Sequence, residues 1–484
     1  MNLPRPPVVT ILGHVDHGKT TLLDYIRKST IATKEHGGIT QKIGGYEVKT
    51  GIKGYLTDKI TFIDTPGHEA FSFLRARGAN VADIAILIID GKDGIMPQTA
   101  ESISHIKNAK IPFIVAINKV DLVETNIDKV KNGLLKYEIM VEGKGGKVLA
   151  MPISAKTGKG VNELLEAILL LSSDLNLEYD PQAPISGYII ETKKDRRGIV
   201  TSIILRNGGL KISQDIFTND MKIRVKAIID DYGRPLKQVF PSTPVEILGF
   251  NELPQTGSLI SAVSTSKEQE IKQETSKPHL DMASFLATNQ PKEKKLSLVI
   301  KTDSQGSLEA ITNSLAKNTN INIILSAVGS IHKSDIFLAK VSKAIVIGFN
   351  SAIDPDIKEL AKQEKVIIKT YNIIYDLFDE LNEVSDLMKE KEEKEKNLKG
   401  QAKILANFII EGEKVVGIKV TKGKINLGDE LKVFRGNSLL GETKLVSLQI
   451  RAKKANEVKK DQEAGMVLSP PLDIRVGDVV KSIL

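Results

Sequence analysis

The octapeptide Gly13–Thr20, Gly-His-Val-Asp-His-Gly-Lys-Thr, constrains the fold of this chain more than any other segment. It fits the pattern G-x-x-x-x-G-K-[ST], in which the backbone N–H groups of a glycine-rich turn converge on phosphate oxygens. The apolar run Val8–Leu12 precedes it, and the helical pattern Thr21–Arg27 follows it. This order of strand, turn and helix predicts an α/β domain with a phosphate-binding loop, rather than a glycine-rich turn that binds nothing.

Short apolar runs alternate with helical patterns through the first part of the chain, which is typical of a doubly wound parallel sheet. The further runs that predict buried strands are Ile60–Ile63, Ile84–Ile89, Ile111–Ile117 and Val148–Ile153. The helical patterns are Glu69–Gly78, Ala100–Ala109 and Val161–Leu171. We predict that residues 1–175 form one α/β domain of this kind.

The chain has 484 residues, more than one hydrophobic core holds, and its residue pattern changes along the sequence. Residues 181–264 alternate short β-branched runs with turn signals, which predicts a small antiparallel β-barrel. Residues 265–295 are polar and predict a linker, whereas residues 296–384 return to alternating strands and helices. The charged stretch 385–400 predicts a solvated helix between two domains. Residues 401–484 predict further strands, with a hairpin that resembles one in the first barrel.

Composition excludes several classes of function. The chain has no cysteine, which rules out disulfides, Cys-ligated zinc, iron–sulfur clusters and a thiol nucleophile. It has no tryptophan, so we do not expect aromatic platforms that stack single-stranded nucleic acid. The net charge of +8 permits a phosphate-rich partner without demanding one. The longest apolar run, Ile84–Ile89, is too short to span a membrane, and we expect a cytoplasmic protein without a membrane partner.

A second motif, Asn118-Lys119-Val120-Asp121, follows the predicted strand Ile111–Ile117. The Asp121 carboxylate can accept hydrogen bonds from the N1–H and N2–H₂ groups of guanine, a pair that adenine lacks. Asn118 would tie the loops together, and the stem of Lys119 can pack over the base. Alone, this tetrapeptide is common in surface turns, but here it lies where open sheets bind nucleotides. Ser154-Ala155-Lys156 follows another predicted strand, and its N–H groups can meet the guanine O6.

The segment Asp64-Thr65-Pro66-Gly67-His68 carries groups that suit phosphoryl transfer. The Gly67 N–H can detect a γ-phosphate, and His68 can orient or polarise an attacking water. By itself His68 would be a surface histidine, but the preceding D-x-x-G favours a catalytic role.

Lys19 would meet the β- and γ-phosphates, and three oxygen side chains are predicted to hold Mg²⁺. Thr20 would bind the ion directly, Asp64 through a water, and Thr40 when its loop closes on the γ-phosphate. The stretch around Gly37–Thr40 is equally compatible with an ordinary flexible loop. The predicted GTP-binding residues are Gly13, His14, Val15, Asp16, His17, Gly18, Lys19, Thr20, Thr21, Asp64, Thr65, Pro66, Gly67, His68, Asn118, Lys119, Asp121, Ser154, Ala155 and Lys156.

Together these motifs resemble those of the translational GTPases, and the histidine after D-T-P-G is a feature of that family. Further segments resemble bacterial translation initiation factor two in particular. They are Gly37–Gln41 with Ile43-Gly44, Met96–Thr99 after Asp93-Gly94, Thr302–Ala310, Ala344–Asn350 and Tyr371–Asp376. The resemblance covers nearly the whole chain.

The resemblance implies a GTPase domain, a β-barrel, an α/β/α domain, a helical linker and a C-terminal β-barrel. It implies GTP-dependent recruitment of formylmethionyl initiator tRNA to the small ribosomal subunit and promotion of subunit joining, alongside other initiation factors. Hydrolysis would be triggered by the large subunit, with His68 as the hydrolytic histidine. Val15 and Ile39 match an apolar gate beside that histidine, and Asp16 matches a position linked to a monovalent cation. Nothing in the sequence indicates a homo-oligomer, so we expect a monomer.

Two features depart from the family pattern. The family often has a long lysine-rich region before the GTPase domain, whereas Val8 starts the first predicted strand here, which indicates a short form or a fragment. The pocket for the tRNA end usually carries two cysteines, and alignment places Ile418 and Ala464 at those positions. Glu463 and Gly465 match the pocket. Arg451 lies in Leu448–Lys454, where a Lys-Arg-aromatic-Lys-Asp-Asp pattern is common.

Three other functions stay open at the level of sequence. The first is another translational GTPase, such as an elongation-type factor, which the match at Thr302–Ala310 disfavours. The second is a GTP-regulated RNA-binding scaffold with no role in initiation. The third is an ATP-using phosphoryl-transfer enzyme, which Asn118 and Asp121 disfavour.

Overall fold

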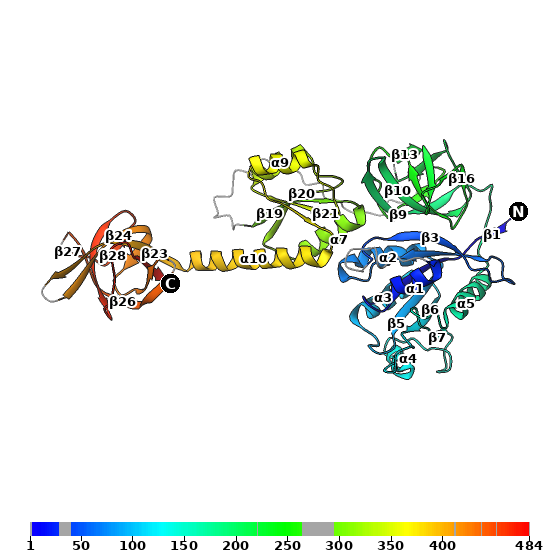
Figure 1. Cartoon of the computed structure of the whole chain (residues 1–484), viewed down its shortest axis with the longest axis horizontal. Helices are drawn as coiled ribbons and strands as arrows, with labels where there is room; N and C mark the ends of the chain where they lie inside the picture. Colours follow the sequence, from blue (N-terminus) through cyan, green and yellow to red (C-terminus); the bar gives the residue numbers. More distant parts are fainter. Residues whose placement is uncertain are drawn as a thin grey trace. The chain divides into compact units, whose positions relative to one another are not determined.

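The computed structural model describes residues 2–28, 40–219, 221–263, 295–410, 413–436, 438–451 and 453–483 (Figure 1). The predicted loop at Gly37–Ile39, with the gate residue Ile39, lies outside these ranges, as does nearly all of the predicted linker 265–295. The chain divides into two compact units, Met1–Phe378 and Asp379–Leu484.

The first domain contains a six-stranded sheet in the order β3-β4-β2-β5-β6-β7. Its parallel strands are β4 (Lys59–Asp64), β2 (Val8–Gly13), β5 (Ile84–Asp90), β6 (Phe113–Asn118) and β7 (Ala150–Pro152). Strand β3 (Gly44–Lys49) pairs antiparallel with β4 at the edge. Every residue of β2 and β5 is buried, which is why both read as continuous apolar runs.

Helices cover both faces of this sheet, so the doubly wound fold predicted for the domain is confirmed. The helices are α1 (Lys19–Arg27), α2 (Ser72–Val81) after the 3₁₀ turn Glu69–Phe71, α3 (Pro97–Ala109), α4 (Ile127–Leu135) and α5 (Val161–Asp174). One core cluster joins the sheet to α1 and α5, and a second joins it to α3 and α4. The sequence pattern did not indicate β3 or α4.

The second domain is an antiparallel sheet of eight strands, in the order β13-β12-β18-β9-β10-β17-β14-β15, curved around its own apolar core. Its strands are β9 (Ser186–Asp195), β10 (Gly198–Asn207), β12 (Asp215–Thr218), β13 (Met221–Arg224), β14 (Ala227–Asp230), β15 (Pro235–Leu236), β17 (Pro244–Leu248) and β18 (Leu259–Ser261). The short strands β11 (Leu210–Lys211) and β16 (Gln238–Val239) pair beside it. Another short pair joins β1 (Leu3–Pro4) to β8 (Glu178–Tyr179).

A buried carboxylate joins this barrel-like domain to the first one. Asp83 accepts hydrogen bonds from both terminal nitrogens of Arg5 at 2.7 Å, from Arg206 on β10, and from the Val8 N–H at 2.8 Å. Burial opposes the charge on Asp83, but the hydrogen bonds from Arg5 and the charge of Arg206 hold its pKa below the ordinary value. Arg5 also donates to the hydroxyl of Ser242.

The third domain has a parallel sheet in the order β20-β19-β21-β22. Its elements are β19 (Leu296–Thr302), α7 (Gln305–Leu315), β20 (Ile321–Val328), α8 (Lys333–Ser342), β21 (Ile345–Phe349), α9 (Pro355–Gln363) and β22 (Ile368–Tyr371). Helices α8 and α9 share a core cluster with β19 and β21. The following helix α10 spans Ile374–Lys396, so it begins within the range predicted for the third domain rather than at residue 385.

The second unit contains a closed six-stranded β-barrel, as the resemblance implied. Around the barrel the strands are β23 (Leu398–Ile410), β30 (Val479–Ile483), β25 (Glu430–Arg435), β26 (Ser438–Ile450), β29 (Glu463–Ser469) and β24 (Glu413–Asn426). Short strands β27 (Lys453–Lys454) and β28 (Glu457–Lys459) pair with β26 and β24. In the parts of the chain that the structure describes, no helix is both long and apolar enough to cross a membrane.

Candidate nucleotide site

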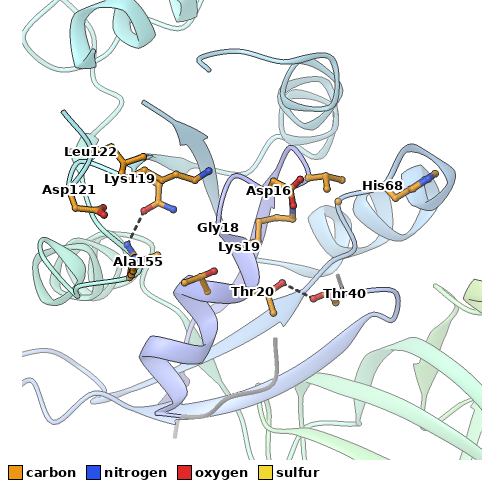
Figure 2. Close-up of a pocket in the computed structure, with 15 residues that line it drawn as sticks. Asp16, Gly18, Lys19, Thr20, Thr40, His68, Lys119, Asp121, Leu122 and Ala155 are labelled. Atoms are coloured by element: carbon orange, nitrogen blue, oxygen red, sulfur yellow. Dashed lines mark hydrogen bonds between the residues drawn. The ribbon is translucent and has the colours of Figure 1, made fainter. Parts of the chain in front are cut away.

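A cavity of about 450 Å³ opens at the carboxyl edge of the first sheet (Figure 2). Five segments of the chain meet there: the loop before α1, Thr40, the loop after β4, the loop after β6 and the loop after β7. Residues predicted to bind nucleotide supply most of the wall. The lining residues are Val15, Asp16, Gly18, Lys19, Thr20, Thr21, Thr40, Gly67, His68, Asn118, Lys119, Asp121, Leu122, Ala155 and Lys156.

The backbone of the first loop adopts conformations that favour glycine. Gly18 has φ of 95° just before the first residue of α1, and Asp16 has φ of 63°. A Cβ on Gly13 would lie 2.4 Å from the carbonyl oxygen of Ile88, so strand β5 leaves no room for a side chain. The helix N-terminus and the N–H groups of this loop together form an anion-binding cradle.

Lys19 is the buried cation of this cradle. Its Nζ donates to the carbonyl oxygens of Gly13 at 3.1 Å and His14 at 2.5 Å. Burial lowers the pKa of Lys19 to about 8, although the carboxylate of Asp64 opposes the shift. An ammonium group held in this way has few competing partners and is suited to bind phosphate oxygens.

Three oxygen-bearing side chains converge beside Lys19. The hydroxyls of Thr20 and Thr40 are 2.8 Å apart, and the Thr40 hydroxyl donates to the Asp64 carboxylate at 3.2 Å. Hydroxyl and carboxylate oxygens are the donors that Mg²⁺ prefers. The set predicted for a metal ion is therefore brought together and fits a hard divalent cation.

The loops after β6 and β7 form the other end of the cavity. Asn118 donates to the carbonyl of His17 at 2.8 Å and accepts from the Ala155 N–H at 2.9 Å, so one side chain joins three loops. Ser154 donates to the Asp121 carboxylate at 2.7 Å, and this hydrogen bond lowers the pKa of Asp121. Lys119 pairs with the buried Asp90 at 2.6 Å. Asp121 thus presents an ionised acceptor at the cavity edge.

His68 follows Gly67 at the phosphate end, but its ring is directed away from the centre of the cavity (Figure 2). Its Nδ1 accepts a hydrogen bond from the Ala70 N–H at 2.9 Å. The ring packs against Tyr375 of α10, with centroids 4.3 Å apart. Burial lowers the pKa of His68, which favours the neutral imidazole.

Some predicted residues support the cavity instead of lining it. The His17 ring is buried, and this burial lowers its pKa to about 4. The Thr65 hydroxyl donates to the Ile11 carbonyl at 2.8 Å. The other predicted residues outside the cavity lining are Gly13, His14, Asp64, Pro66 and Ser154.

Sequence reasoning missed the side chain that fixes the loop after β4. Arg75 on α2 is fully buried and donates to the carbonyls of Pro66 at 3.0 Å and His68 at 2.5 Å. Its other terminal nitrogen donates to both oxygens of Glu101 on α3, at 2.9 and 2.7 Å. Burial opposes the charge on Glu101, but hydrogen bonds from His105, Ser72 and Arg75 lower its pKa to about 2. The sequence signal that could have identified this residue is an arginine inside the helical segment that packs on the sheet.

None of the residues proposed for a tRNA-end pocket lines the cavity that lies on the described part of the barrel. Ile418 and Ala464 face each other across β24 and β29, and both side chains belong to the barrel core. Glu463 and Arg451 are exposed, and Gly465 is half-buried. A separate cavity of about 240 Å³ lies between β23, β24 and the segment after β29.

The sequence of this chain matches family models and known proteins along most of its length. Three family models match: the elongation factor Tu GTP binding domain over residues 5–173, elongation factor G domain 2 over 184–263, and translation-initiation factor 2 over 268–382. Translation initiation factor IF-2 of Halothermothrix orenii is 41% identical over 99% of this chain and 71% of that protein. The chain belongs to the translation initiation factor IF-2 family.

IF-2 of Bartonella tribocorum is 44% identical over 99% of this chain, and the chain spans 59% of that protein's length. A crystal structure of GDP-bound aIF5B from Aeropyrum pernix aligns with 99% of this chain and 92% of that chain, with 26% identity and a TM-score of 0.48.

Proposed function

We propose that this chain binds and hydrolyses GTP with Mg²⁺ and acts as a translation initiation factor. The observation that carries the proposal is the cavity that joins the buried Lys19, the converging oxygens of Thr20 and Thr40, and the ionised Asp121. Lys19 and the loop N–H groups bind phosphate, and Asp121 accepts from the guanine edge. Membership of the IF-2 family supports the role in initiation.

Different residues of the site carry the separate tasks of GTP hydrolysis. Thr20, Thr40 and Asp64 would hold Mg²⁺, which neutralises charge on the phosphates when bound. The Gly67 N–H faces the γ-phosphate, and His68 orients the attacking water once its ring enters the phosphate end of the cavity. Asp16 is the proposed neighbour of a monovalent cation. Among the described residues that line the cavity there is no arginine, so we expect slow hydrolysis by the protein alone and activation by the ribosome.

We further propose that the partners are the two ribosomal subunits, formylmethionyl initiator tRNA and other initiation factors. The factor would recruit this tRNA to the small subunit and promote subunit joining as a cytoplasmic monomer. The C-terminal barrel would contact the tRNA end at Arg451, Glu463 and Gly465, with Ile418 and Ala464 behind them in the core.

Binding of formylmethionyl and unformylated methionyl initiator tRNA to the full chain, side by side, tests the recruitment proposal. A preference for the formylated form supports a pocket rebuilt around Ile418 and Ala464. Equal binding indicates that the barrel reads the RNA end without formyl selection, which other components would then supply. Failure to bind either tRNA contradicts recruitment and leaves subunit joining as the function to measure.

Nucleotide binding is expected to take up a proton at alkaline pH. Lys19 has a pKa of about 8 because it is buried, and the phosphates of GTP raise this pKa towards its ordinary value. Between these two values the complex holds more protons than the free protein, so the affinity for GTP falls as the pH rises above 8. At pH 9 calorimetry in two buffers of different ionisation enthalpy should report uptake of about 0.9 proton.

At pH 6.5 Lys19 is protonated with and without GTP, so proton uptake by Lys19 on GTP binding should approach zero. Equal uptake at pH 6.5 and pH 9 would show that another group titrates.

A further inference from the structure

Both loops at the phosphate end contact the start of helix α10. Gln41, next to Thr40, donates from Nε2 to the Asn372 carbonyl at 2.8 Å and accepts from the Ile374 N–H at 3.1 Å. Its side chain is buried. The next residue of α10, Tyr375, contacts His68 in the other loop. The first turn of this helix therefore contacts both segments that complete the nucleotide site.

The His68 ring lies among three aromatic rings. Tyr375 is the nearest, at 4.3 Å between centroids with an interplanar angle of 56°, and Phe71 and Phe378 lie at 6.0 and 6.5 Å. The two phenylalanine distances lie within the range of centroid separations that aromatic pairs prefer, about 4.5–7 Å, and the Tyr375 distance lies just below it. Tyr375 is the nearest of these three rings, and it belongs to the first turn of α10.

This arrangement has a chemical consequence for His68. Because Nδ1 accepts from the Ala70 N–H, its lone pair is occupied, and the proton of the neutral ring is at Nε2. A histidine that positions the attacking water must instead bring a ring nitrogen within hydrogen-bond reach of that water, next to the γ-phosphate. Figure 2 shows the ring directed away from Lys19 and Thr20. The ring must therefore leave Tyr375 before it can act on water.

We propose that Tyr375 is a positioning residue for His68, which holds the imidazole against α10 and out of the phosphate end of the cavity. The inference rests on the proposed function and adds to it the contact that keeps unstimulated hydrolysis slow. An aromatic pair of this kind shifts a two-state equilibrium by about five- to tenfold. Removing the Tyr375 ring should therefore raise the population of the active ring position by that factor.

The test is unstimulated GTP hydrolysis by the full chain without ribosomes. Tyr375→Leu keeps apolar bulk but removes the ring, and we expect kcat to rise about five- to tenfold with KM for GTP unchanged. Tyr375→Phe keeps the ring, and its kcat should stay within about twofold of the original protein. Loss of the ring-current shift of the His68 imidazole protons in Tyr375→Leu would report the released ring directly.

Two further variants separate ring release from general loosening of the helix. Gln41→Ala removes the other contact to the first turn of α10 and should leave unstimulated kcat within about twofold. Tyr375→Leu combined with His68→Ala should show no gain. An unchanged kcat in Tyr375→Leu, a gain that persists without His68, or an equal gain in Gln41→Ala overturns the proposal. If the proposed function itself is wrong, ribosomes will not stimulate GTP hydrolysis by the original protein, and this result is separate from the effect of the variants.

Discussion

Replacing His68 with alanine is expected to lower ribosome-stimulated GTP hydrolysis about 10³-fold, the usual contribution of a positioned group that acts on the attacking water. The affinity for GTP should change by less than about twofold, because Lys19 and Asp121, which we propose to bind the nucleotide, are held by hydrogen bonds that do not involve this ring. Single-turnover hydrolysis with saturating ribosomes separates the chemical step from binding. A fluorescent GTP analogue measures the affinity in parallel.

His332, at the N-cap of α8 in the third domain, provides the matched control. It is exposed and takes no part in the cavity, so His332→Ala should hydrolyse GTP like the original protein. If His68→Ala keeps a stimulated rate within tenfold, the backbone groups of the loop after β4 position the water without the imidazole.

Asparagine at position 121 is expected to reverse the base preference. In the proposed complex the Asp121 carboxylate would accept from two guanine donors, N1–H and N2–H₂, whereas an amide offers one acceptor and one donor. Xanthine has a carbonyl oxygen where guanine has the amino group, and therefore matches the amide. We expect the ratio of GTP to XTP affinity to fall by about 10⁴-fold in Asp121→Asn, since each mismatch leaves polar groups unpaired.

Competition of GTP and XTP against a labelled nucleotide measures this ratio directly. Leu122→Ala is a suitable control, since Leu122 lines the same end of the cavity with an apolar side chain that cannot distinguish the two bases. An unchanged ratio in Asp121→Asn would mean that the base is read by another group.

The sequence predicted those parts of the site in which short-range pattern and chemistry coincide. The glycines around Lys19 and the carboxylate of Asp121 each follow a buried strand, so their place at one edge of the sheet follows from the topology of a parallel fold. Strand β3 escaped prediction because it begins with two glycines and carries little apolar alternation. Helix α4 is short and has an interior glycine.

Contacts between distant segments were beyond sequence reasoning. Gln41 and Asn372 are separated by 331 positions, and no local pattern marks either as a partner of the other. Arg75 reads as a surface residue of an amphipathic helix, although it is fully buried because loop carbonyls and Glu101 satisfy its donors. Likewise, alignment placed Ile418 and Ala464 in a pocket, whereas the alternation of the strands directs them into the barrel core.

The ion pairs at Asp83 have a mechanical consequence. Arg5 and Asp83 are 9% and 8% exposed in their side chains, whereas the pair Lys42–Asp303, which reaches the third domain, is 57% and 18% exposed. Breaking a buried pair costs several kcal/mol, about 3–5, but an exposed pair contributes at most about 1 kcal/mol. The buried pairs at Asp83 therefore hold the first two domains together firmly. The third domain relies instead on contacts such as the buried Gln41 side chain, which bonds Asn372 and Ile374 at the start of α10.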